Sequence, residues 1–154
     1  MINLLATGTF LYASYWNYPG GYALHWLNHN APKNESLKIH IDVFSAQTGI
    51  SRFLHSNTNW EYNKTENLES SQLLKTEKFT HLLIGHPSDV ETIFRHKYST
   101  LWKIIHTEFG FRGIRIISNP QEILRRFLKR EFFVHFKIVP QVLVLETAAA
   151  YKLV

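Results

Sequence analysis

The sequence predicts a mixed α/β domain of four or five strands with flanking helices, preceded by an apolar segment. Short runs in which apolar and polar residues alternate are typical of strands, and helix-start signals lie between those runs. The chain has 154 residues with 45% hydrophobic content, which suffices for one sizeable core but not two. We expect a lead-in over 1–16, the α/β domain over 17–147 and a tail over 148–154.

The lead-in is apolar and uncharged, since no Asp, Glu, Lys or Arg precedes Lys33. Its aromatic residues Tyr12, Tyr15 and Trp16 gather at one end, an arrangement that a membrane–water interface favours. The run is shorter than the roughly 20 residues that span a bilayer. A buried helix or strand is the alternative. We favour the end of a transmembrane helix that stands off the domain with its apolar side chains exposed.

The elements of the first half follow in order. After Pro19-Gly20-Gly21, a helical pattern runs to about residue 30. Alternation over 37–43 predicts a half-buried strand, and 45–55 has the pattern of a helix interrupted only by Gly49. The polar residues from 56 to 78 predict a long loop with one short strand and one helical turn.

The second half begins with a strand at 80–84, which ends at Gly85. Ser88-Asp89-Val90-Glu91 matches a capping box and predicts a helix to about Tyr98. Residues 101–109 are compatible with strand or helix, and 114–117 predict a strand.

The clearest helix start in the chain is Asn119-Pro120, a capping residue followed by a proline. Alternation over 132–138 then predicts a strand that Pro140 breaks, and 142–145 form the last strand.

Composition excludes several kinds of chemistry. The chain has no cysteine, which excludes disulfides, zinc–thiolate sites, iron–sulfur clusters and cysteine nucleophiles. His25 and His29 have the i, i+4 spacing of metal ligands but no third ligand adjoins them, so no metal site is expected. No glycine-rich nucleotide motif occurs, and no cofactor is expected.

The net charge of +5 hints at an anionic partner. Basic residues gather between 112 and 137, with Phe127, Phe132 and Phe133 among them. Because these phenylalanines fall on predicted core faces, a solvated helix face, or one resting on anionic lipid, is favoured over a nucleic-acid site. Asn34-Glu35-Ser36 and Asn63-Lys64-Thr65 are sequons in polar segments, so Asn34 and Asn63 are candidate glycosylation sites.

Three stretches together resemble one family. They are Asn17-Tyr18-Pro19-Gly20-Gly21; His40-Ile41-Asp42-Val43 with Ala46-Gln47-Thr48-Gly49-Ile50-Ser51-Arg52-Phe53; and Trp60-Glu61-Tyr62 followed by Lys64. They are similar to the C-terminal part of the dolichyl-phosphate-mannose-dependent α-1,6-mannosyltransferase of the endoplasmic reticulum. That family adds the eighth mannose to the lipid-linked oligosaccharide used for N-glycosylation. The resemblance covers about 4–62 well, and the strand at 80–84 and the last strand fit more loosely. The basic segment 119–130 is not a pattern that aligns with the family.

The resemblance implies a multi-pass membrane glycosyltransferase of the type-C fold, of which this chain is a fragment. The chain would start inside the last membrane helix and continue into the luminal C-terminal domain. The family's catalytic carboxylate lies in an upstream luminal loop without counterpart here, so no catalytic residue is assigned and the fragment is expected to be inactive alone.

The matched segment supplies the substrate-facing candidates His40, Asp42, Gln47, Thr48 and Arg52. Packing and contact with the glycan or lipid substrate both remain open for them. Arg52 is the basic residue nominated to steady a leaving phosphate.

The implied partners are dolichyl-phosphate-mannose, the lipid-linked oligosaccharide and the membrane, and no nucleic acid. Two other hypotheses remain. One is a soluble basic α/β module that binds nucleic acid or a nucleotide. The other is a membrane-anchored interaction domain without a catalytic role. An apolar lead-in favours either membrane hypothesis over the soluble module.

Overall fold

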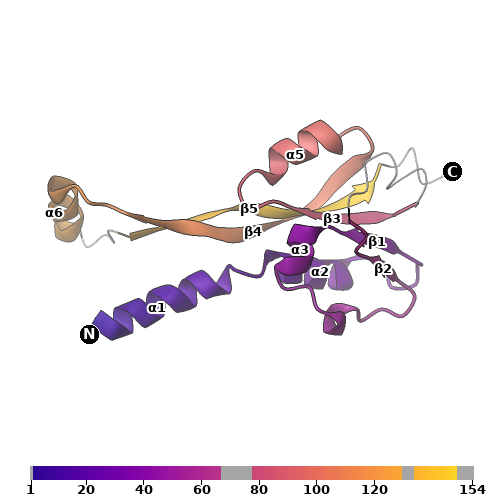
Figure 1. The fold of residues 1–154 in the computed structure, drawn as a ribbon, viewed down its shortest axis with the longest axis horizontal. Helices are drawn as coiled ribbons and strands as arrows, with labels where there is room; N and C mark the ends of the chain where they lie inside the picture. Colours follow the sequence, from indigo (N-terminus) through magenta and orange to yellow (C-terminus); the bar gives the residue numbers. More distant parts are fainter. Residues whose placement is uncertain (1, 67–77, 130–133, 149–154) are drawn as a thin grey trace.

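The computed structural model describes residues 2–66, 78–129 and 134–148, and it has the predicted mixed α/β class (Figure 1). Its five-stranded sheet has the order β2-β1-β3-β5-β4. The strands are β1 (Lys38–Ile41), β2 (Glu61–Asn63), β3 (His81–Gly85), β4 (Trp102–Ile116) and β5 (Val134–Thr147). β1 is parallel to β2 and β3, whereas β5 is antiparallel to β3 and β4.

Helices cover both faces of the sheet (Figure 1). α2 (Pro19–Asn30) and α3 (Val43–Gln47) lie on one face, and α5 (Val90–Lys97) lies on the other. A core cluster beneath α2 includes Leu24 and Leu27, and a second cluster around Phe79 and Val90 lies on the α5 side. The helix predicted up to residue 30 and the strand predicted at 80–84 are confirmed.

The two long strands correct the sequence prediction. Residues 101–109 and 114–117 belong to one strand, β4, and Pro140 lies inside β5 instead of breaking it. Pro140 pairs with Phe109 at a register shift of β4, beyond the last β3–β5 pair, Gly85 with Val142. A proline is tolerated there because β5 has a neighbouring strand on one side only. Residues 132 and 133 lie outside the described chain.

Beyond β3, β4 and β5 continue as a two-stranded arm that leaves the domain (Figure 1). α6 (Pro120–Leu128) lies at its tip. The predicted start of this helix is confirmed, since the Asn119 Oδ1 accepts a 3.0 Å hydrogen bond from the Gln121 N–H.

Three local predictions are wrong. The single helix expected over 45–55 is the short α3, a turn and a 3-10 turn (Arg52–Leu54), because Gly49 has a φ of +104° that a helix does not accept. The capping box is absent, since α5 begins after Asp89 and no side chain caps it. β1 is buried on both faces instead of one, because α2 packs on one side and His40 meets Phe79 on the other.

The lead-in forms α1 (Ile2–Tyr15), which stands off the domain as expected (Figure 1). Leu4, Phe10 and Leu11 are exposed; the side chain of Leu5 is outside the description. Within the described ranges, no helix combines the length and the hydrophobicity needed to cross a bilayer.

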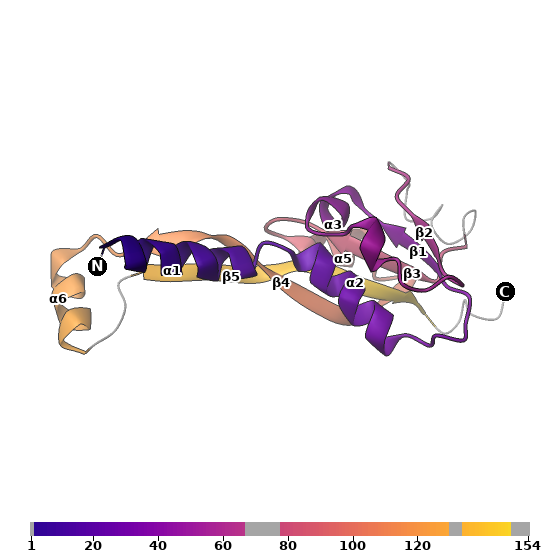
Figure 2. The ribbon, with the colours of Figure 1, turned by 90° about the horizontal axis from the view of Figure 1, so that it is seen from below.

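α1 extends in the same direction as the arm but diverges from it toward the N-terminus, and its C-terminal end contacts the arm (Figures 1 and 2). The Tyr12 ring lies 4.6 Å from that of Phe136, and the carbonyl of Trp16 accepts a 3.0 Å hydrogen bond from the Phe111 N–H.

Candidate functional site

The candidate site begins at Asp42, which follows β1 directly. Its Oδ1 accepts a 2.7 Å hydrogen bond from the Ser45 N–H and caps α3, while its Oδ2 accepts one of 2.7 Å from the Gly85 N–H. The carboxylate therefore ties the ends of β1 and β3 to the start of α3. Burial raises its pKa above the usual 3.8, and the two backbone donors oppose that shift.

Thr48 joins the end of α3 to the start of α2. Its hydroxyl donates to the Phe44 carbonyl at 2.9 Å and accepts from the Gly20 N–H at 3.1 Å. Its own carbonyl accepts a 3.0 Å hydrogen bond from the Gly21 N–H. Two backbone N–H groups of the first turn of α2, which have no partner within that helix, are thus satisfied by Thr48 at the end of α3.

Glycine at position 20 is required by this contact. A Cβ there would overlap the Ser45 carbonyl oxygen and lie 2.7 Å from the Thr48 hydroxyl oxygen. Tyr18 closes the other side, with its Cβ 3.1 Å from where a Cβ on Gly49 would lie. The first two stretches that carry the family resemblance therefore interlock, and we call this contact the α2–α3 clasp (17–21 with 42–49).

The third stretch supports residues 50–55, which follow the α2–α3 clasp in sequence. The Tyr62 ring stacks on the His55 ring at 4.0 Å, and the Asn28 side-chain amide donates to the Leu54 carbonyl at 2.8 Å. The Lys64 ammonium lies 3.5 Å from the Ile50 carbonyl oxygen. These contacts hold 50–55 against the domain.

The five predicted substrate-facing candidates divide into two groups. His40, Asp42 and Thr48 point into the domain, whereas Gln47 and Arg52 are exposed. His40 is buried, its Nδ1 has no hydrogen-bond partner among the described residues, and burial lowers its pKa. Next to Arg52, Phe53 is 98% exposed and held on the 3-10 turn. The exposed residues of the matched segment are Val43, Gln47, Ser51, Arg52 and Phe53.

The two sequons differ in exposure. Asn34 is exposed. Asn63 is half-buried at the end of β2, and its Oδ1 accepts a 2.7 Å hydrogen bond from the Thr65 N–H.

An aromatic groove of about 340 Å³ lies between the end of α1, α2 and β4. It is lined by Tyr15, Trp16, Tyr22, His25, Trp26, His29, Asn30, Glu108 and Phe109. The Trp26 ring stacks on His106 at 4.3 Å, and His106 Nε2 lies 2.8 Å from Glu108 Oε1. Flat aromatic surfaces beside a few polar groups suit a sugar ring better than a nucleotide phosphate.

Sequence reasoning missed this groove, because it considered His25 and His29 only as metal ligands. Their rings lie 4.2 Å apart, and His29 Nδ1 is hydrogen-bonded to the His25 carbonyl. Within the described residues, no three His, Cys, Asp or Glu side chains are placed to share a metal ion. The many aromatic residues between 12 and 26 were the sequence signal for this groove. Glu108 could not be assigned to it from the sequence, because only the fold brings β4 next to α2.

Comparison with known proteins identifies relatives of one kind. The chain is 35% identical over 128 residues to the Dol-P-Man:Man(7)GlcNAc(2)-PP-Dol alpha-1,6-mannosyltransferase of Arabidopsis thaliana, covering 81% of this chain and 25% of the relative. The proteins of the same name from Drosophila melanogaster and Saccharomyces cerevisiae are 32% and 29% identical, over 71% and 73% of this chain. They are covered over 15% and 21% of their own lengths.

No family model and no solved structure matches the chain. It spans a quarter or less of each of these three relatives. The relatives are enzymes by name, and the similarity extends over most of this chain. The chain is therefore related to part of the Dol-P-Man:Man(7)GlcNAc(2)-PP-Dol alpha-1,6-mannosyltransferases.

Proposed function

We propose that the chain is the luminal C-terminal part of an endoplasmic-reticulum mannosyltransferase. The longer enzyme would transfer mannose from Dol-P-Man to Man(7)GlcNAc(2)-PP-Dol, as the names of the relatives state. The observation that carries the proposal is the α2–α3 clasp. Two of the three stretches with family resemblance meet in it, and the third supports residues 50–55, which follow the clasp.

This part is proposed to be inactive alone, because the catalytic base is assigned to another part of the longer enzyme. Mannosyl transfer needs a carboxylate base that takes the proton of the acceptor hydroxyl while the dolichyl phosphate leaves. Both oxygens of Asp42 already accept backbone hydrogen bonds, and Glu108 is paired with His106. We assign the base to another part of the longer enzyme, in line with the upstream catalytic carboxylate that the family resemblance implies.

Arg52 and Gln47 are the substrate-facing residues in this proposal. Their side chains are exposed on the rim of the clasp, and a guanidinium suits a phosphate oxygen. His40, Asp42 and Thr48 act as positioning residues, because their polar atoms lie in the domain. The aromatic groove is the proposed contact for a sugar ring of the acceptor.

Exposed apolar residues on α1 support attachment to the membrane part of the longer enzyme. Leu4 is 77% exposed, which is costly in water but not beside lipid or another apolar helix. The luminal side is proposed because Asn34 lies in an exposed sequon.

Mannosyl transfer in microsomes tests the proposal. The chain alone should transfer no mannose, whereas Arg52→Ala in the longer enzyme should lower turnover per folded molecule. Thr48→Val should instead lower the amount of folded enzyme. Wild-type turnover in the Arg52→Ala enzyme would remove Arg52 from the site, and transfer by the isolated chain would contradict the assignment of the base elsewhere.

A further inference from the structure

The helix at the tip of the arm presents its apolar side outward. Four apolar side chains of α6 are exposed: Ile123, Leu124, Phe127 and Leu128. Phe127 is 77% exposed, whereas the side chains of Glu122 and Arg126 are 29% and 20% exposed. A surface helix in water normally has the opposite arrangement.

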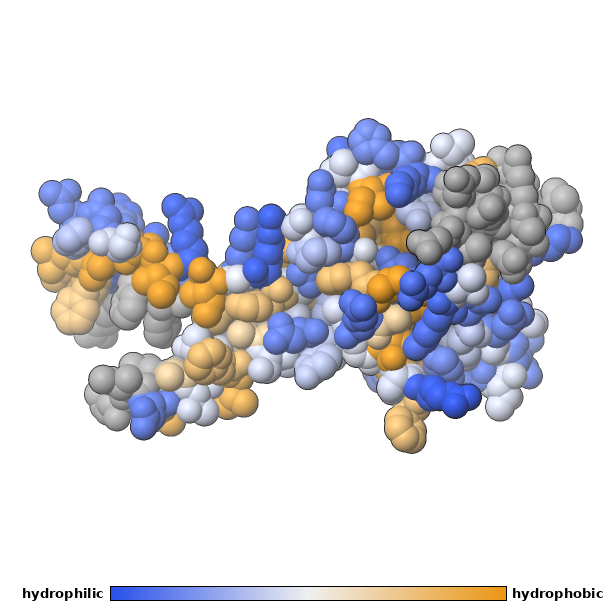
Figure 3. All heavy atoms as spheres, viewed as in Figure 1, coloured by the Kyte–Doolittle hydropathy of each residue, from blue (hydrophilic) through white to orange (hydrophobic). Residues whose placement is uncertain are grey.

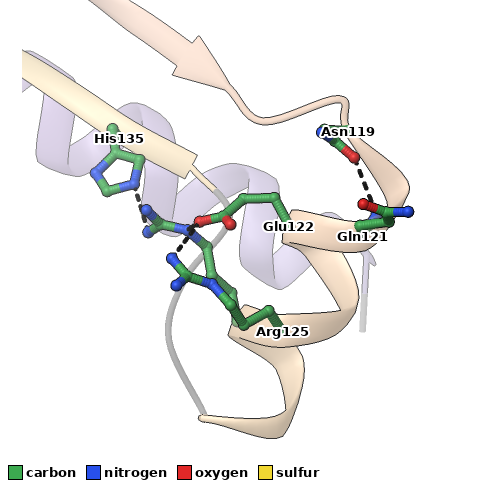
Figure 4. Close-up of polar contacts among 6 residues, drawn as sticks. Asn119, Gln121, Glu122, Arg125 and His135 are labelled. Carbon is green, nitrogen blue, oxygen red and sulfur yellow. Dashed lines mark hydrogen bonds and ion pairs between the residues drawn. The ribbon is translucent and has the colours of Figure 1, made fainter.

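Polar contacts hold this orientation (Figure 4). Glu122 Oε1 accepts hydrogen bonds from Arg126 Nε at 2.8 Å and from Arg125 Nη2 at 3.0 Å. Arg126 Nη1 in turn lies 2.8 Å from His135 Nε2 on β5. Arg126 thus links the polar side of α6 to the arm, whereas the Arg125 side chain is 60% exposed and the four apolar side chains are left outside.

The surroundings of α6 are basic. Residues 112–137 contain seven Lys or Arg and two Asp or Glu, an excess equal to the net charge of +5 of the whole chain. Arg112, Arg115, Lys129 and Lys137 are exposed. An apolar face flanked by basic side chains is complementary to a phospholipid surface.

The start of α1 lies at the same end of the molecule as α6 (Figures 1 and 2). In the space-filling view, apolar residues continue from α6 along the arm (Figure 3). Ile114 and Ile116 are the exposed apolar residues of β4 there. One end of the molecule therefore carries apolar surface on three elements.

We propose that α6 is an in-plane membrane helix, whose apolar face enters the headgroup–acyl boundary of a phospholipid bilayer while the neighbouring basic residues bind headgroup phosphates. The inference depends on α6 and the arm, not on mannosyl transfer.

Labelled single-cysteine variants of the full chain test this proposal. The chain has no cysteine, so Phe127→Cys and Phe53→Cys each give one site for an environment-sensitive fluorophore. Both positions are highly exposed, but Phe53 lies on the domain. With vesicles of phosphatidylcholine and phosphatidylserine at two to one, we expect a blue shift at position 127 and none at 53. Vesicle binding without a shift at 127 would overturn the proposal.

Vesicle flotation supplies the affinity. Leu124→Gln with Phe127→Gln should weaken binding by about tenfold or more, because two apolar side chains no longer enter the bilayer. The matched control Phe53→Gln should bind like wild type, and any contribution of α1 is common to all variants. Equal loss in the control would overturn the proposal. So would a concentration-dependent shift at 127 without vesicles, which would assign the face to a second copy of the chain.

Discussion

The Gly20 N–H donates a 3.1 Å hydrogen bond to the hydroxyl of Thr48, which lies 28 residues further along the chain. This contact joins the first turn of α2 to the last of α3, and the Asp42 carboxylate joins α3 to β1 and β3. The side chains of Asp42 and Thr48, which were candidates for substrate contact, thus stabilise the domain. In the same matched segment, the exposed polar residues Gln47 and Arg52, together with Phe53, are available to contact a ligand or the rest of an enzyme.

Replacing Thr48 should destabilise the fold. In Thr48→Val the Gly20 N–H loses its acceptor, and an unsatisfied donor costs about 1–3 kcal/mol. Urea denaturation measures the loss in the free energy of unfolding. Thr48→Ser keeps the hydroxyl and serves as the control. Equal stability of the valine variant and wild type would show that the clasp does not stabilise the domain.

Stability should decrease on acidification because of His40. Burial lowers the pKa of His40 below its usual 6.5, so below that pH the unfolded chain binds a proton that the folded chain does not. The contribution of neutral His40 to folding stability is therefore complete above pH 6.5, and it is lost as the pH falls through the lowered pKa of the folded state. In His40→Leu the slope of stability against pH should be smaller, since His55, whose pKa is also lowered, remains. Identical slopes in variant and wild type would contradict this account.

Glycosylation should favour one sequon. In microsomes Asn34 should receive a glycan, because it is exposed, whereas half-buried Asn63 should be modified less. Endoglycosidase treatment should shift the wild-type band, and Asn34→Gln should abolish most of the shift while Asn63→Gln should keep it. A membrane-inserted chain that shows no shift at all would contradict the luminal placement.

The aromatic groove should bind mannose oligosaccharides. Two of the four tryptophans, Trp16 and Trp26, line it, so ligand binding should change the intrinsic fluorescence. Tyr22→Ala removes an aromatic surface from the lining and should weaken the response severalfold, since an aromatic contact is worth about 0.5–1.5 kcal/mol. Phe53→Ala is the control outside the groove. No fluorescence change at saturating oligosaccharide would exclude this groove as the sugar contact.

Local signals predicted the elements where the sequence itself determines the backbone. Asn119-Pro120 starts α6 through one side-chain hydrogen bond, and the short strand before Gly85 forms as expected. The long strands were missed because Pro140 is acceptable only where β5 lacks a second neighbour, which depends on where β3 ends.

The site was predicted in part for a similar reason. The stretches with family resemblance named the residues of the α2–α3 clasp, but not which of their side chains point inward. That distinction depends on a long-range contact between Gly20 and Thr48. The aromatic groove needs Glu108 to approach α2, which the sequence does not indicate.

Replacing the matched part of the Saccharomyces cerevisiae relative by this chain tests the central claim most directly. Mannosyl transfer from Dol-P-Man to Man(7)GlcNAc(2)-PP-Dol would be measured in microsomes and divided by the amount of folded, membrane-inserted chimera. We predict that the chimera transfers mannose, and that Arg52→Ala in it lowers this rate without lowering the amount of protein. A chimera that accumulates like the natural enzyme but transfers no mannose would contradict the claim that this chain is part of such a mannosyltransferase.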